Sequence, residues 1–179
     1  MPIVPDDKNW TWVLERPCPE CGFDAADVDI GAMGDFIRDN VARWPALLEH
    51  ERVAVRPASD RWSALEYACH VRDVFRLYDK RLRLMLDLDD PRFENWDQDA
   101  TAIEDRYDLQ DPASVSRELV EAGNAFAALW DTVQPEQLGR RGMRSDGAEF
   151  TVASFGVYFL HDPIHHLDDV ARGNALLAG

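Results

Sequence analysis

The sequence predicts an all-α fold, a four-helix bundle preceded by an irregular N-terminal arm. Apolar residues recur at three- and four-residue steps in long segments, which is the period of an amphipathic helix. Two of these segments also have clear start signals: Ser63 and Glu66 form a Ser-x-x-Glu capping box, and Asp111 precedes a proline at a first helical position. The expected helices lie near residues 29–50, 63–88, 112–133 and 151–172.

The segments between these helices carry breaking and turning residues. Residues 1–28 contain prolines and a Cys-x-x-Cys pair, so we expect an arm separate from a bundle domain at residues 29–179. Pro45 should kink or divide the first helix. Residues 89–110 show no sustained period and predict a long crossover with short helical pieces that covers a pocket. Asp146-Gly147 indicates a short hairpin, and Gly173 should close the last helix.

Composition limits the class of protein. With 179 residues, of which 46% are hydrophobic, the chain can build one well-buried core. Its net charge of −15 would repel phosphate backbones and anionic lipid, so neither nucleic acid nor a membrane is an expected partner. There is no apolar stretch long enough to span a bilayer and no signal-peptide pattern at the N-terminus, which predicts a cytoplasmic protein.

Histidines concentrate the chemistry. His161 and His165 stand one turn apart in the last predicted helix, where two imidazoles can share a metal ion. His70, in an apolar part of the second helix, is the candidate third ligand. Three imidazoles with an open fourth position are typical of a catalytic site for zinc, and nickel, iron or manganese would also accept them.

These residues carry a family resemblance. The chain resembles the DinB-like superfamily of four-helix metalloproteins, whose pattern is one histidine early in the second helix and a His-x-x-x-His pair in the last. The resemblance includes Trp62-Ser63 at the start of the second helix and Asp73, and it covers residues from about 29 to 172. It implies one divalent metal, zinc or nickel, held by His70, His161 and His165.

Carboxylates near these histidines are expected to orient them, because metal-bound imidazoles usually donate their second N–H to an acid or a carbonyl. Asp73 could serve His70, and Asp168 or Asp169 could serve His165. His166 points about 100° away from His165 and is assigned a supporting or surface role. Pro163 lies between the two ligands: either the helix kinks there with both histidines inward, which we favour, or Asp162 caps a new helix.

The remaining histidine and the tryptophans have ordinary structural interpretations. His50 is taken as a residue at a helix end. Trp62, Trp96 and Trp130 are taken as core or pocket wall.

Cys18 and Cys21 form a Cys-x-x-Cys knuckle, half of a structural metal site or a redox pair. A structural zinc needs four ligands, and Cys69 is the one further cysteine in the sequence. The alternatives are two reduced thiols on a surface arm, or a site completed by histidine, carboxylate or a second subunit, which would make a homodimer. We expect the knuckle to be accessory to the three-histidine site.

The resemblance implies a metal-dependent enzyme that uses a low-molecular-weight thiol such as mycothiol or bacillithiol to act on a small electrophile. A metal with an open position lowers the pKa of a bound thiol, which supports S-transfer chemistry. The high content of Arg, Ala and Asp indicates a GC-rich genome. Of the two thiols, this favours mycothiol. Two other functions stay open: hydrolysis by a metal-bound hydroxide, and a non-catalytic metal-binding or stress-interaction module.

Overall fold

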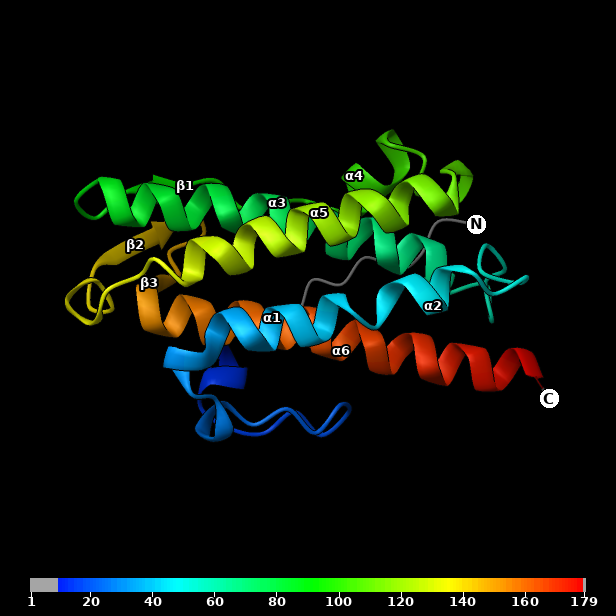
Figure 1. The fold of residues 1–179 in the computed structure, drawn as a ribbon, viewed down its shortest axis with the longest axis horizontal. Helices are drawn as coiled ribbons and strands as arrows, with labels where there is room; N and C mark the ends of the chain where they lie inside the picture. Colours follow the sequence, from blue (N-terminus) through cyan, green and yellow to red (C-terminus); the bar gives the residue numbers. More distant parts are fainter. Residues whose placement is uncertain (1–9, 179) are drawn as a thin grey trace.

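The computed structural model describes residues 10–178, which form a four-helix bundle capped by a small sheet at one end (Figure 1). The bundle helices are α1 (Met33–Val41), α3 (Ala64–Asp87), α5 (Pro112–Trp130) and α6 (Val152–Ala178). In Figure 1, α1 and α6 run in one direction and α3 and α5 in the other. Contacts join α3 with α5, α1 with α5, α3 with α6 and α1 with α6, so the four helices close a ring. The all-α bundle is therefore confirmed.

Pro45 divides the first predicted helix. After α1 the chain makes a turn and resumes as α2 (Trp44–Leu48), with the proline in the first turn of the new helix. Proline is tolerated there because the N–H that it lacks would have no partner within the helix. The start of α3 follows the predicted capping box: the Ser63 hydroxyl accepts from the Glu66 N–H at 3.2 Å, and the Glu66 carboxylate accepts from the Ser63 N–H at 2.9 Å.

The long connection between α3 and α5 is a crossover, as expected, with short elements in it. These are β1 (Arg92–Phe93), α4 (Gln98–Glu104) and the 3-10 turn η4 (Tyr107–Leu109). The predicted hairpin is formed by β2 (Arg141–Arg144) and β3 (Glu149–Thr151), which are antiparallel, and its turn places Gly147 at φ +94°. The strand β1, which the sequence did not indicate, pairs in parallel with β2 to complete the sheet.

The last helix passes through Pro163 without interruption, as in the alternative favoured from the sequence, and no new helix starts at Asp162. It differs from expectation at its end, because it continues past Gly173, which was expected to close it. A Cβ at Gly173 would lie 3.2 Å from the Pro57 ring, so the small residue allows a close approach of the helix to the segment before α3. Close packing of the helix body outweighs the terminating tendency of glycine here.

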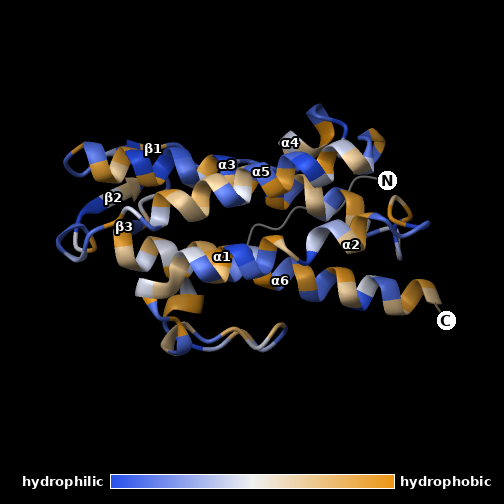
Figure 2. Cartoon of the chain, in the orientation of Figure 1, coloured by the Kyte–Doolittle hydropathy of each residue, from blue (hydrophilic) through white to orange (hydrophobic). Residues whose placement is uncertain are grey.

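The N-terminal arm packs along α6 and α1 (Figure 1). Its described part, residues 10–28, contains the 3-10 turns η1 (Trp10–Leu14) and η2 (Ala25–Asp27). A further 3-10 turn, η3 (Ile30–Ala32), precedes α1, so the first helix begins later than the expected residue 29. Apolar and polar residues alternate around the bundle helices (Figure 2), and the side chains that face inward form one core, which includes Cys18 and Phe23 from the arm. No helix within residues 10–178 is long and apolar enough to cross a membrane.

Candidate functional site

One turn of α6 faces α3 across the bundle and brings together His70, Asp162 and His166. Each offers one donor atom, and the three atoms lie within 4.8 Å of one another. Nε2 of His70 lies 3.4 Å, and Nε2 of His166 3.7 Å, from the same oxygen, Oδ1 of Asp162. Ligands about 2.1 Å from a tetrahedral zinc are separated by about 3.4 Å, so these spacings fit one divalent ion.

Within residues 10–178, two polar atoms of this cluster are buried without a hydrogen-bond partner, although Oδ2 of Asp162 lies within hydrogen-bond distance of Nε2 of His70, at 3.5 Å. Oδ1 of Asp162 and Nδ1 of His70 are buried and have no hydrogen-bond partner among the described residues. Orphaned atoms of this kind are costly in a native structure unless an ion or water satisfies them. Burial raises the pKa of the Asp162 carboxyl, but the charges of His70 and His166 outweigh it and hold that pKa well below its usual range. The carboxylate is therefore ionised and available as a ligand.

Aromatic side chains surround the cluster. Trp96 of the crossover stacks on His70 with ring centroids 5.3 Å apart and planes 8° from parallel. Trp62 packs on the same imidazole at 5.4 Å, and Tyr67 lies 5.0 Å from His166. Trp96 thus brings residues 89–110 into contact with the cluster, and the pocket expected beneath this segment stays a prediction. His70 itself is fully buried, whereas 31% of the Asp162 side chain stays exposed.

Asp169 orients His166. Its Oδ2 lies 3.0 Å from Nδ1 of His166, so an N–H at Nδ1 can donate to the carboxylate and leave Nε2 directed at Asp162. Burial raises the pKa of the Asp169 carboxyl, but the hydrogen bond with His166 and the neighbouring charges of His166, His165 and Arg172 together lower it further, so the ionised form is favoured. The same oxygen lies 3.7 Å from Nε2 of His165, so Asp169 is placed near both imidazoles, and its supporting role for a metal ligand stays a prediction.

A second face of the same helical turn, about 100° around the helix, carries His161 and His165, which meet the N-terminal knuckle. One donor atom each from Cys18, Cys21, His161 and His165 lies within 4.8 Å of the others. Burial lowers the pKa of His161 to about 4 and also lowers that of His165, so both imidazoles are neutral at pH 7. The three cysteines of the chain are all free thiols in the structure.

The structure therefore does not bring His70 together with His161 and His165. Successive residues on a helix differ by about 100°, so the pair 161/165 and the pair 162/166 point to different neighbours. The 162/166 pair faces α3, and the 161/165 pair faces the arm. The interpretation of the knuckle as accessory to a three-histidine site is corrected in the same way, because the cysteines contact two of those histidines directly.

Asp162 is the residue that sequence reasoning missed, since it was considered as a helix cap and not as a ligand. The available signal was the spacing Asp162-x-x-x-His166, which repeats that of His161 and His165 one residue later. A Cys-x-x-Cys pair lacking two ligands was the second signal. Together the two patterns imply two clusters.

Asp73 does not orient His70. Its carboxylate bonds Arg72 at 2.9 Å and accepts from the Tyr107 hydroxyl at 2.7 Å, away from the imidazole. Asp168 pairs with Arg172 at 2.9 Å. His50 is exposed at the end of α2, where its Nδ1 accepts from the Arg52 N–H. Trp62 and Trp130 are buried, as predicted for core or wall residues.

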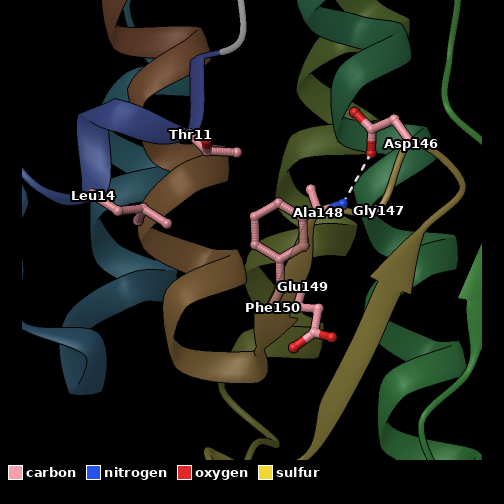
Figure 3. Close-up of a pocket in the computed structure, with 7 residues that line it drawn as sticks. All are labelled: Thr11, Leu14, Asp146, Gly147, Ala148, Glu149 and Phe150. Carbon is pink, nitrogen blue, oxygen red and sulfur yellow. Dashed lines mark hydrogen bonds between the residues drawn. The ribbon is translucent and has the colours of Figure 1, made fainter.

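A separate pocket of about 290 Å³ lies between η1 and the hairpin (Figure 3). Its walls are Thr11, Leu14 and the hairpin residues 146–150. Its two acids are engaged elsewhere: Asp146 pairs with Arg144, and Glu149 with Arg141. The residues that line this pocket include neither histidine nor cysteine, so the candidate metal ligands of the two clusters lie outside it.

Comparisons with known proteins agree with this architecture. YfiT from Bacillus subtilis, a probable metal-dependent hydrolase with an unusual four-helix bundle topology, superposes with a TM-score of 0.68. The match covers 81% of this chain and 87% of that chain at 19% sequence identity. No curated protein sequence matches the chain. The family model of the DinB superfamily matches residues 33–170, a range that holds α1, α3, α5 and most of α6, with His70, Asp162 and His166. The chain therefore belongs to the DinB superfamily.

Proposed function

We propose that the protein is a metal-dependent hydrolase whose catalytic ion is held by His70, Asp162 and His166. The observation that carries the proposal is the convergence of both Nε2 atoms on Oδ1 of Asp162, at 3.4 Å and 3.7 Å. Two histidines and one carboxylate form a ligand set of catalytic zinc, which keeps a fourth position for water or substrate. A divalent ion bound there would lower the pKa of a water molecule and supply a nucleophile near neutral pH.

Charge favours water over a thiol at this cluster. The three imidazoles expected from the sequence would leave both positive charges of the ion uncompensated and would attract a thiolate strongly. With Asp162 in place of one imidazole, one of those charges is neutralised. The pull on an anionic fourth ligand is weaker, and the advantage of a thiol over water falls accordingly.

Access supports an open position on the side of Asp162. His70 is closed off by Trp62 and Trp96, while the side chains of Asp162 and His166 are 31% and 16% exposed. A small substrate could therefore approach along α6. Asp169 would keep the His166 ring fixed as charge develops, since it accepts from the nitrogen that faces away from Asp162. The resemblance to YfiT, itself a probable metal-dependent hydrolase, agrees with this chemistry.

The test compares the wild type with Asp162→Asn, His70→Ala and the control His50→Ala. Metal content is measured by mass spectrometry, and initial rates are measured on chromogenic carboxylic esters, phosphate esters and small amides, each with and without an added low-molecular-weight thiol. We expect thiol-independent hydrolysis by the wild type and by His50→Ala. Loss of a direct ligand should cost more than the roughly 10–100-fold typical of residues that only support a ligand.

Three outcomes would overturn the proposal. Turnover that requires the thiol would replace hydrolysis by S-transfer to an electrophile. A metal-loaded wild type with no turnover under any of these conditions would indicate a binding module. Full rates in Asp162→Asn and His70→Ala would place the chemistry elsewhere.

A further inference from the structure

The cluster of Cys18, Cys21, His161 and His165 has the composition of a closed metal site. Cys18 and Cys21 come from the arm, and His161 and His165 from α6, with one donor atom each inside a 4.8 Å group. Sγ of Cys18 lies 3.7 Å from Nδ1 of His165. A sulfur about 2.3 Å and a nitrogen about 2.0 Å from a tetrahedral zinc are about 3.6 Å apart, so the spacing matches.

The imidazoles have the surroundings of metal ligands. His165 directs Nδ1 at Cys18, while its Nε2 faces Glu20 at 3.8 Å and Asp169 at 3.7 Å. A ligand histidine commonly gives its second N–H to a carboxylate in this way. His161 is 5% exposed, and its Nε2 is buried with no hydrogen-bond partner among the described residues. A cation in the group would satisfy that nitrogen.

The backbone of the knuckle holds the two thiols on one side. The Cys18 N–H donates to the Phe23 carbonyl at 2.8 Å, and the Gly22 N–H donates to the Cys18 carbonyl at 2.9 Å. Gly22 has φ +76°, a left-handed conformation that glycine adopts without strain, and this closes the loop directly after the second cysteine. The four-residue spacing on α6 then supplies two ligands from the other side.

Aromatic rings shield the cluster from solvent. Trp10 lies 5.3 Å from both imidazoles, and Phe23 packs edge-on against His161 at 5.4 Å. Cys18 is 1% exposed, and Cys21 is partly buried. Four protein ligands close a structural zinc site, and both thiols would then be engaged by the ion.

We propose that Cys18, Cys21, His161 and His165 bind one structural Zn²⁺, which fastens the N-terminal arm to α6. The site is distinct from the His70 cluster and does not depend on the function proposed for it. Thiolates and neutral imidazoles select zinc over harder cations such as Mg²⁺ and Ca²⁺. The arm lies outside residues 33–170, so the two cysteine ligands come from a segment beyond the region that the family model matches.

Cobalt(II) provides a direct test, because thiolate ligation produces a charge-transfer band that histidine and carboxylate ligands do not produce. Fully reduced, metal-free wild type is titrated with Co²⁺ and then with Zn²⁺. We expect a thiolate band that saturates with one equivalent and is abolished by Zn²⁺. His70→Ala should keep the band, and so should Cys69→Ser, a matched control for a buried thiol outside the cluster. Cys18→Ser/Cys21→Ser should lose the band together with one equivalent of zinc.

The wild-type spectrum decides the question even where the double variant fails to fold. A reduced, folded wild type without a thiolate band would overturn the site. A band that persists in Cys18→Ser/Cys21→Ser, or one that disappears in Cys69→Ser, would show that Cys18 and Cys21 are not the thiolate ligands. Zinc loss in His50→Ala would show that the measured ion is not held by the cluster.

Discussion

Asn40 is the buried residue that ties α1 to the helical turn carrying both clusters, and Asn40→Ala tests how much that tie contributes. The side chain is 4% exposed. Its Nδ2 donates to the Pro163 carbonyl at 2.9 Å, and its Oδ1 accepts from the Trp44 indole N–H at 3.0 Å. Pro163 lies between the first and the second member of each ligand pair on α6, so this amide anchors the turn from the side of α1.

The cost follows from the partners that alanine would leave behind. The Trp44 side chain is fully buried, and its N–H would have no acceptor, which costs about 1–3 kcal/mol. Loss of the bond to the Pro163 carbonyl adds about 0.5–1.5 kcal/mol. The higher helix propensity of alanine returns at most about 0.7 kcal/mol. We expect a net loss of about 2–3 kcal/mol, a large part of the 5–15 kcal/mol typical of a domain.

Urea unfolding followed by tryptophan fluorescence measures this difference, with the metal content of both proteins matched. Asn124→Ala, at an exposed position of α5, is the control, and its unfolding free energy should change by less than about 1 kcal/mol. A loss below about 0.5 kcal/mol in Asn40→Ala would refute the reasoning, because it would mean that water or a rearrangement satisfies the indole.

Two further predictions concern packing and charge. Gly156→Ala should destabilise the fold by about 1–3 kcal/mol in the same assay, because a Cβ would lie 2.6 Å from the buried Trp130 ring. The control is Gly139→Ala, whose Cβ would have no heavy atom of residues 10–178 within 4 Å and whose unfolding free energy should change little. Asp73→Asn should cost roughly 2 kcal/mol at pH 7 without loss of metal, because the bonds to Arg72 and Tyr107 are lost and the His70 cluster is not. Burial raises the pKa of Asp73, but the hydrogen bonds with Arg72 and Tyr107 lower it further. The contribution of Asp73 to the unfolding free energy is therefore present above about pH 4 and is lost as the pH falls further, so the difference in unfolding free energy between variant and wild type should shrink there. Metal loss in Asp73→Asn would contradict the assignment.

The fold was largely predictable because its signals are local. Capping at Ser63, the Asp111-Pro112 start and the break at Pro45 depend on a few neighbouring residues, and each appears in the structure at the expected place. The strand β1 could not be found this way, because two residues have no measurable period and the strand is defined only by its pairing with β2. The extension of α6 past Gly173 likewise depends on packing against Pro57, a distant residue.

The site was predictable in its elements but not in its grouping. The sequence identified α6, His70 and the cysteine knuckle as the places that hold the candidate metal ligands. Which of two adjacent pairs on α6 faces α3 depends on the rotation of that helix, and a sequence pattern does not report the rotation. The family resemblance favoured the His161/His165 pair because histidines are more conspicuous than an aspartate. The packing assigns His70 instead to the pair that contains Asp162.

One helical turn thus serves two clusters, which raises the question of whether they depend on each other. A rotation of α6 by about 100° would move one pair to the position of the other and break both clusters, so anything that fixes this rotation supports both. The arm fixes it from one side through the knuckle, but α6 also contacts α1, α3 and the sheet strand β3. These bundle contacts bury large aromatic side chains such as Phe155 and Phe159, each worth several kcal/mol, and they would persist without zinc in the knuckle. The bundle is therefore the main determinant of the orientation of Asp162 and His166. Loss of the knuckle metal should leave the His70 cluster able to bind its own ion, with reduced rather than abolished affinity.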